Sequence, residues 1–164
     1  MLQHANIAPT LYREAMSRMA VAVTIVTTDG PAGRRGLTVS AACSVTDNPA
    51  TVLVCLNHQP ADNALFVKNG VFALNVLTAG QEPLARAFAG EGRLSQEERF
   101  ALGEWETRET GAPVLKNALS SFDCRITEWK DVSTHRILFG AVADLVIGPD
   151  VDALAYRERR YRAL

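Results

Sequence analysis

The sequence predicts a mainly β fold, a mostly antiparallel β-barrel with peripheral helices. Three β-branched or apolar segments, residues 21–28, 36–45 and 51–56, follow one another with only turns between them. Short helical patterns come next, and strand patterns return after Pro113. A doubly wound parallel sheet would need a long crossover helix after each strand, and the sequence has no such alternation.

Length and composition are those of one domain, residues 1–164. The chain is 48% hydrophobic and 21% charged, and no repeat or linker divides it. Its 17 Lys and Arg balance 18 Asp and Glu, so we expect no nucleic-acid partner. No apolar run approaches the roughly 20 residues that span a bilayer, and the N-terminal residues lack a secretory signal pattern. We therefore expect a cytoplasmic protein with no membrane partner.

The first element is expected to be a helix capped by Thr10, because apolar residues repeat at helical spacing after it. These residues are Tyr12, Ala15, Met16 and Met19. Four strands are expected next, at residues 21–28, 36–45, 51–56 and 71–77. Residues 30–36 would form a hairpin turn between the first two strands and could place Arg34 or Arg35 near a ligand. The continuous apolar run 51–56 predicts a strand covered on both faces.

Three short helices are expected in the middle of the chain. Asp62 can cap the first, which would end at Asn69-Gly70. Pro83 fits the first turn of the second, which would end at Gly90. Residues 95–98 form a capping box for the third.

Strands are expected again in the last third of the chain. Phe122, Cys124 and Ile126 alternate with polar residues until Glu128-Trp129, where the break in alternation predicts a bulge. A long strand over residues 136–147 and a short one over 154–161 complete the pattern.

No catalytic or metal-binding motif stands out. The three cysteines lack CxxC spacing, and each lies in an apolar run, so we expect three small buried side chains rather than a disulfide or zinc site. The three histidines are scattered, so no protein-bound metal is expected. The sequence also lacks a GxSxG elbow, a Walker loop and a GxGxxG fingerprint.

Two segments have the composition of a ligand site. Residues 36–46 combine strand character with hydroxyl and very small side chains, which would let a flat ligand approach the backbone. The alternative is a strand with one solvated face. Residues 55–63 pass from an apolar strand to polar residues at a helix start, where backbone N–H groups favour an anion such as phosphate. The alternative is an ordinary loop with Asp62 as the helix cap.

The chain resembles the short-chain flavin reductases of two-component monooxygenases, in particular the reductase partners of 4-hydroxyphenylacetate hydroxylase and of the pyrimidine ring-opening monooxygenase. The resemblance covers residues 10–162 and rests on motifs in a fixed order. These are MAVAVTIVTTDGPAGRRGLTVSAACSVTDNPATVLVCLN, VFALNVLTAGQEPLARAFAG, PVLKNALSSFDCRI and THRILFGAV. It implies an FMN-binding split β-barrel with Greek-key topology, assembled as a homodimer.

The resemblance also implies an NAD(P)H:flavin oxidoreductase that passes a hydride from the nicotinamide to FMN or FAD and supplies a separate oxygenase. In such enzymes the cofactor carries the reactivity and the protein supplies position and electrostatics. The implied flavin-binding positions are Leu37, Thr38, Val39, Ser40, Cys43, Ser44, Val45, Cys55, Leu56, Asn57, Ala61, Asn63, Phe88, Ala89, Gly90 and Tyr161. His135 matches the family histidine on the nicotinamide side and is the implied catalytic residue; by itself it would be a structural residue at a strand start.

Two positions depart from the family pattern. Ser133 stands where the family often has glycine, before Thr134-His135. Arg162 follows Tyr161 where many relatives have histidine, and it could engage a phosphate instead.

Other functions remain open at this point. The same fold could hold its flavin tightly and reduce a bound acceptor such as a cobalt corrinoid. It could also be a flavin- or haem-binding module without turnover, or an interaction domain without a cofactor. The sequence does not separate FMN from FAD or NADH from NADPH, and it does not identify the oxygenase.

Overall fold

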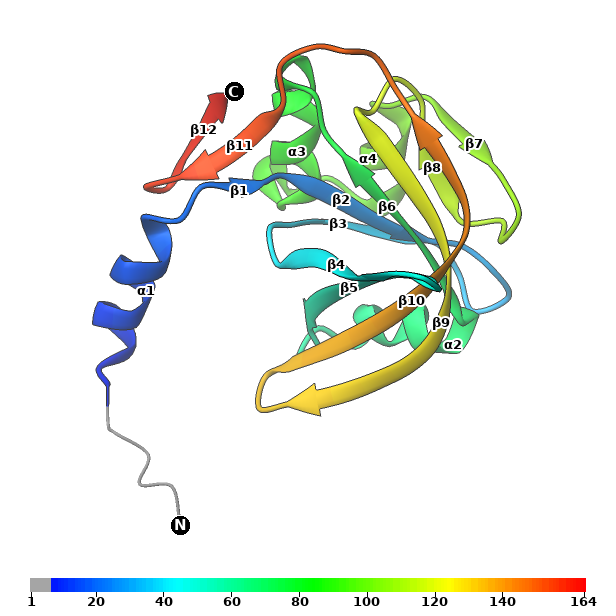
Figure 1. Cartoon of the computed structure of the whole chain (residues 1–164), viewed down its shortest axis with the longest axis horizontal. Coiled ribbons are helices and arrows are strands. Elements are labelled where there is room, and N and C mark those ends of the chain that lie inside the picture. The colour runs from blue at the N-terminus through cyan, green and yellow to red at the C-terminus, as the bar shows by residue number, and fades with distance from the viewer. Residues whose placement is uncertain (1–6) are drawn as a thin grey trace.

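The computed structural model describes residues 7–164 and is mainly β, as the sequence predicts (Figure 1). A curved sheet of seven antiparallel strands forms its centre, with a three-stranded and a two-stranded sheet beside it. The strands are β1 (Val21–Ala22), β2 (Thr24–Thr28), β3 (Arg35–Val39), β4 (Ala42–Asp47), β5 (Ala50–Asn57), β6 (Val71–Val76), β7 (Trp105–Thr107), β8 (Pro113–Leu115), β9 (Ser120–Val132), β10 (His135–Ile147), β11 (Leu154–Arg157) and β12 (Arg160–Ala163). The helices are α1 (Pro9–Ser17), α2 (Ala64–Asn69), α3 (Glu82–Phe88) and α4 (Gln96–Ala101), with 3₁₀ turns η1 (Ala61–Asn63), η2 (Ala79–Gln81) and η3 (Glu91–Arg93).

The strand order in the large sheet is β3-β2-β6-β9-β10-β5-β4. β3 and β4 are therefore its two edges, although only Ser40 and Ala41 separate them in the chain. The expected single strand over residues 36–45 is thus wrong. The chain turns a corner at Ser40-Ala41, where the Cys55 N–H donates to the Ala41 carbonyl at 2.8 Å. Within residues 7–164 no ladder joins β3 to β4.

The expected strand over residues 21–28 is divided between two sheets. β1 pairs with β11 in the three-stranded sheet, and β2 lies between β3 and β6 in the large one. Every residue of β2 is buried, so both faces of this strand are covered. Polar side chains of β2 form hydrogen bonds to the two neighbouring strands. The Thr24 hydroxyl donates to the Val39 carbonyl at 3.0 Å, and the Thr28 hydroxyl donates to the Val71 carbonyl at 2.8 Å.

Three apolar clusters of buried residues lie within residues 7–164, and the two largest cover opposite faces of the sheet. One contains Ile25, Leu84, Phe88 and Phe100 beneath α3 and α4. The other contains Val26, Val52, Val54, Leu56, Phe66, Phe72 and Leu138. β5 contributes its buried side chains to the second cluster, while the alternate residues Leu53 and Cys55 are only half-buried. The expectation that this strand is fully covered on both faces is therefore wrong.

Helix boundaries follow the chemical signals at most positions. Gly70 is in the left-handed region (φ 71°) and ends α2, and Pro83 lies in the first turn of α3. The capping box of α4 is confirmed: the Glu98 N–H donates to Ser95 Oγ at 3.2 Å, and the Ser95 N–H donates to the Glu98 carboxylate at 2.7 Å. Asp62 does not cap a helix with its side chain but lies within η1.

The predicted cap of α1 is also wrong. The helix starts at Pro9, so Thr10 lies inside it and the residue at the N-cap is Ala8. A proline in the first turn supplies the fixed φ that starts a helix without a side-chain cap.

The last third of the chain consists of hairpins. β9 and β10 form a long hairpin with a bulge at Thr127, one residue before the predicted break, because Ile126 pairs with Gly140 and Glu128 with Phe139. The expected single strand 154–161 is instead the hairpin β11–β12. Its turn residues Glu158 and Arg159 both have positive φ (49° and 59°), as a tight two-residue turn requires.

The cysteines differ in environment. Cys124 is buried as expected, and burial raises the pKa of its thiol to about 12. Cys55 is half-buried, and Cys43 is exposed, so the prediction of a buried side chain is wrong for Cys43. None of the helices in residues 7–164 is long and apolar enough to cross a membrane.

Gly140→Ala is expected to destabilise the protein by about 1–3 kcal/mol, because overpacking a core has this cost. A Cβ at Gly140 would collide with the Phe72 ring and lie 2.8 Å from Cys124 Cβ. Urea denaturation measures the change in the free energy of unfolding. The control is Gly80→Ala, whose Cβ would meet nothing closer than Thr78 Oγ1 at 3.9 Å. Equal effects of the two variants would contradict the packing argument.

Candidate functional site

The β3–β4 corner places the small-residue segment at two exposed sheet edges. Leu37 and Thr38 are half-buried on β3 and Val39 is buried, whereas Ser40 is exposed at the corner. On β4, Cys43, Ser44 and Val45 are all exposed. Within residues 7–164 each edge strand has one side without a ladder. On β3 the Gly36 N–H donates to Gln96 Oε1 at 2.8 Å, so the backbone groups left for a ligand lie toward Ser40.

A cavity of about 190 Å³ opens beside the β3 edge. Its walls come from four segments: the residue between β1 and β2, the end of β3, the residue after α3, and the β11–β12 hairpin. The lining residues are Val23, Thr38, Val39, Ser40, Ala89, Tyr156 and Tyr161. Five of the residues expected to bind a flavin are thus brought together here, namely Thr38, Val39, Ser40, Ala89 and Tyr161. The volume is below the roughly 300–1,000 Å³ of typical ligand pockets, so it suits part of a larger ligand.

One wall of this cavity is aromatic. The rings of Tyr156 and Tyr161 meet edge to face, with centroids 5.1 Å apart. The Arg86 guanidinium lies 4.7 Å from the Tyr161 ring centroid and is held by Glu82 at 2.7 Å and Glu91 at 3.0 Å. Burial raises the pKa of the Tyr161 phenol, with nearby Arg86 acting in the opposite direction. The wall is therefore a neutral aromatic surface backed by a fixed cation. The sequence analysis did not predict a role for Arg86. The only sequence signal for it is the i, i+4 spacing from Glu82, which predicts an ion pair.

The opposite wall is fixed through Thr38. Its hydroxyl donates to the Ala85 carbonyl at 2.6 Å and so joins β3 to α3. Ala89 and Gly90, which follow α3, are exposed, and Gly90 has a positive φ of 101°. Phe88 lies in the core instead, 1% exposed and in edge-to-face contact with Phe100. Phe88 does not line the cavity, so its effect on a ligand would pass through the position of Ala89.

The loop after β5 holds a cluster of polar side chains, separate from the cavity. The Asn63 side chain donates to the Asn57 carbonyl at 2.7 Å and accepts from Arg35 Nε at 3.0 Å. Arg35 Nη1 also lies 3.8 Å from Asp62. Burial lowers the pKa of Arg35, and the Asp62 charge opposes that change. The structure thus places Arg35 at this loop, whereas Arg34 pairs with Asp29 at 2.7 Å.

The remaining residues of this segment differ in exposure. Leu56 is a core residue, Ala61 is exposed and Cys55 is half-buried. The pKa of the Cys55 thiol is raised, first by burial and then by Cys43.

His135 lies beside the loop after β5, at the end of the molecule away from the Tyr161 cavity (Figure 1). It is exposed at the start of β10, opposite Asn57, and its Nδ1 is 2.9 Å from Thr134 Oγ1. His58, which the sequence did not single out, holds the adjacent turn through its Nε2, 2.7 Å from the Ser133 carbonyl. Figure 1 shows the β9–β10 turn and the β11–β12 hairpin at opposite ends of one side of the molecule. A single chain therefore groups His135 with the Asn57 loop and not with Tyr161.

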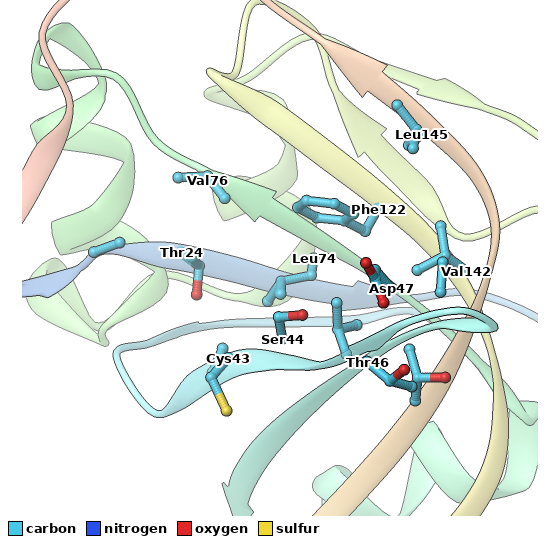
Figure 2. Close-up of a pocket in the computed structure, with 15 residues that line it drawn as sticks. Thr24, Cys43, Ser44, Thr46, Asp47, Leu74, Val76, Phe122, Val142 and Leu145 are labelled. Atoms are coloured by element: carbon cyan, nitrogen blue, oxygen red, sulfur yellow. The ribbon is translucent and has the colours of Figure 1, made fainter.

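Two of the three β4 positions belong to a third place, an apolar groove on the concave face of the sheet (Figure 2), whereas Val45 is exposed and does not line it. Cys43 and Ser44 are among its lining residues, together with Leu74, Phe122 and Val142. The Cys43 sulfur points away from the side chains across the groove (Figure 2).

Arg162, considered above as a phosphate ligand, lies on the C-terminal hairpin. Its Nη2 is 3.6 Å from the Glu158 carboxylate.

Known proteins resemble this chain along nearly its whole length. The family model described as "Flavin reductase like domain" matches residues 16–164. An FMN reductase (NADH) RutF from Ancylobacter novellus is 51% identical over 153 residues, which are 93% of this chain and 83% of the relative.

Two solved structures have the same fold. A protein from Haemophilus somnus assigned as a flavin reductase superposes with a TM-score of 0.92 at 46% identity, covering 96% of this chain and all of the other. BorF, the flavin reductase component of a bacterial two-component tryptophan halogenase, superposes with a TM-score of 0.87 at 28% identity, covering 96% of this chain and 98% of its own.

Ser133→Gly is expected to stabilise the protein by about 0.5–1 kcal/mol. Ser133 has φ 51°, in the left-handed region that costs an L-residue energy and glycine very little. Urea denaturation measures the gain. In the control Ser40→Gly the replaced residue is also exposed but does not have positive φ, so that variant should gain nothing. A loss of stability in Ser133→Gly would show that the serine makes a compensating contact.

Proposed function

Because this chain belongs to the flavin reductase-like domain family, we propose that it is an NADH-dependent FMN reductase. It transfers a hydride from the nicotinamide to the flavin and releases the reduced flavin to a separate protein. The structural observation that supports this most is the cavity where Thr38, Ala89 and Tyr161 meet beside the open β3 edge. The identity of 51% to an NADH-dependent FMN reductase favours this nicotinamide and this flavin.

The residues around the cavity suit a flavin ring. Small side chains at Ser40 and Ala89 let a planar group approach the backbone, and Tyr161 offers an apolar face. Backbone N–H and C=O groups near Ser40, at the cavity end of β3, would bond the polar edge of the ring. Bound flavin supplies the hydride acceptor, and the protein supplies position and electrostatics.

The phosphate end would lie at the loop after β5. Asn57, Ala61 and Asn63 are the positions implied there, and Arg35 adds a guanidinium whose side chain is only 15% exposed. Its bond to Asn63 fixes the direction of the planar fork, which is the geometry that suits phosphate oxygens. Leu37, Val39, Cys55, Leu56 and Phe88 would support these segments through packing.

The finer architecture is part of the proposal. We take residues 1–164 as one domain, the curved sheet as a split β-barrel of Greek-key topology, and the working form as a cytoplasmic homodimer with flavin near the interface. BorF serves a two-component tryptophan halogenase, which supports a separate acceptor of reduced flavin here. For this chain we propose a flavin-dependent oxygenase.

Purified protein should oxidise NADH under anaerobic conditions when FMN is added, because the flavin is then the only acceptor. Stopped-flow absorbance at the NADH and flavin bands measures both changes, with FAD and NADPH as comparison substrates. FMN with NADH should give the highest kcat/KM. Flavin binding without NADH oxidation would instead indicate a binding module, and turnover only with tightly retained flavin would indicate a bound acceptor.

His135→Ala should lower kcat about tenfold or more, while the Kd for FMN changes less than about twofold, because misplacing one reactant slows transfer without weakening the other's site. Rapid-reaction kinetics and flavin fluorescence titration give the two values. Lys130→Ala, an exposed change on the same hairpin, is the control and should change neither. Equal losses in kcat and FMN affinity would contradict a role for His135 on the nicotinamide side.

A further inference from the structure

Helix α1 has an apolar stripe that no other element within residues 7–164 covers. The stripe consists of Tyr12, Met16 and Met19, which repeat at helical spacing along α1 and just beyond it, with Leu11 next to Tyr12 at its edge. These side chains are 64%, 58%, 44% and 53% exposed, and α1 has no buried residue. Four large apolar side chains gathered on one exposed helix face are typical of an interaction surface.

The other face of α1 is bound to its own chain. Glu14 pairs with Arg159 at 2.9 Å, and the Ser17 carbonyl accepts a hydrogen bond from the Glu158 N–H at 2.6 Å. Both contacts are with the β11–β12 turn. They fix the direction of the helix so that the apolar stripe faces outward, and Figure 1 shows α1 projecting away from the sheets.

The groove on the concave face of the large sheet is the matching uncovered surface. It has a volume of about 380 Å³ and is lined mostly by Ala, Val, Leu and Phe side chains from β4, β5, β6, β9 and β10. Leu145 at its margin is 47% exposed. Figure 2 shows Ser44 and Thr46 on one side of the groove and Leu74, Phe122 and Val142 on the other.

Charge also matches between the two surfaces. Asp47 is the one charged residue among the described groove residues. On α1, Glu14 is already paired, and Arg13 and Arg18 flank the stripe on its two sides. An amphipathic helix that lays its apolar face in such a groove is a common recognition mode.

We propose that α1 of a second copy of this chain occupies this groove, and that the exchange is reciprocal. A two-fold axis makes the two helix–groove contacts identical, and each chain both gives and receives a helix. The helix cannot turn back into its own groove while Glu14 and Ser17 hold it to the C-terminal hairpin. This inference rests on the proposed homodimer and specifies its interface.

Two variants test it, one on each surface. Tyr12→Glu puts a charge in the stripe, and Leu145→Lys puts one at the groove margin; both side chains are exposed in the single chain, so folding should be retained. Analytical ultracentrifugation should show a wild-type dimer, and each variant should raise the dimer dissociation constant at least tenfold. Leu102→Glu, also at a 58% exposed residue but away from both surfaces, is the matched control and should remain dimeric.

Mixing the two variants identifies the pairing. In the mixed dimer one helix–groove contact is wild type, and the other brings the carboxylate of the Tyr12→Glu helix to the ammonium of the Leu145→Lys groove. Dimerisation of the mixture should therefore recover toward the wild-type constant. A monomeric wild type, unaffected variants, or a failure of the mixture to recover would each overturn the proposal.

These outcomes do not depend on catalysis. NADH oxidation is measured separately on the wild type, so a dimer of this kind without FMN reductase activity would refute the proposed function and leave the interface standing. An active enzyme whose dimer dissociation constant is unchanged in both variants would refute the interface and leave the proposed function standing.

Discussion

The two-residue connection at Ser40-Ala41 constrains the shape of the whole large sheet. Seven strands laid flat at about 4.8 Å spacing would separate the outermost strands by about 29 Å. Two connecting residues reach only about 10 Å. Because β3 and β4 are those outermost strands, the sheet must curve until its edges come together. The hydrogen bond from Cys55 to Ala41 fixes the corner against the neighbouring strand.

That curvature creates both surfaces that carry the functional argument. On one side of the corner, α3 and the β11–β12 hairpin cover the β3 edge and leave the cavity beside Thr38. On the other side, β4 faces the middle of the sheet across the apolar groove. Small side chains are needed in both places, because bulky ones at Ser40 or Ala42 would fill the space that a ligand or partner needs. The same residues that let the chain turn therefore keep the sites open.

The sequence predicts the elements whose ends have a local chemical signal. Gly70 ends α2, Pro83 starts α3, and the Ser95–Glu98 box starts α4, since each depends on neighbouring backbone atoms only. The corner at Ser40-Ala41 has no such signal, because the β-like pattern continues through it and the bond that fixes it comes from β5. The division of residues 21–28 at Val23 was missed for the same reason, as only the distant β11 shows where β1 leaves the large sheet. Periodicity also left α1 ambiguous: it correctly predicts the apolar stripe but not that the stripe stays exposed.

The candidate site was accessible from the sequence mainly through resemblance, because Thr38, Ala89 and Tyr161 come from segments with no local relation to one another. Arg86 illustrates what neither route singles out, since its importance lies in its contact with Tyr161. For Arg35 the sequence predicts a place near a ligand, but not the bond to Asn63 that fixes it. The geometry adds a constraint of its own. Hydride transfer brings the nicotinamide and the flavin ring into contact, yet one chain holds His135 and the Tyr161 cavity at opposite ends of one side. If both residues act at one flavin, the homodimer proposed above offers the route, because a second chain can supply the residue that the first holds at the far end.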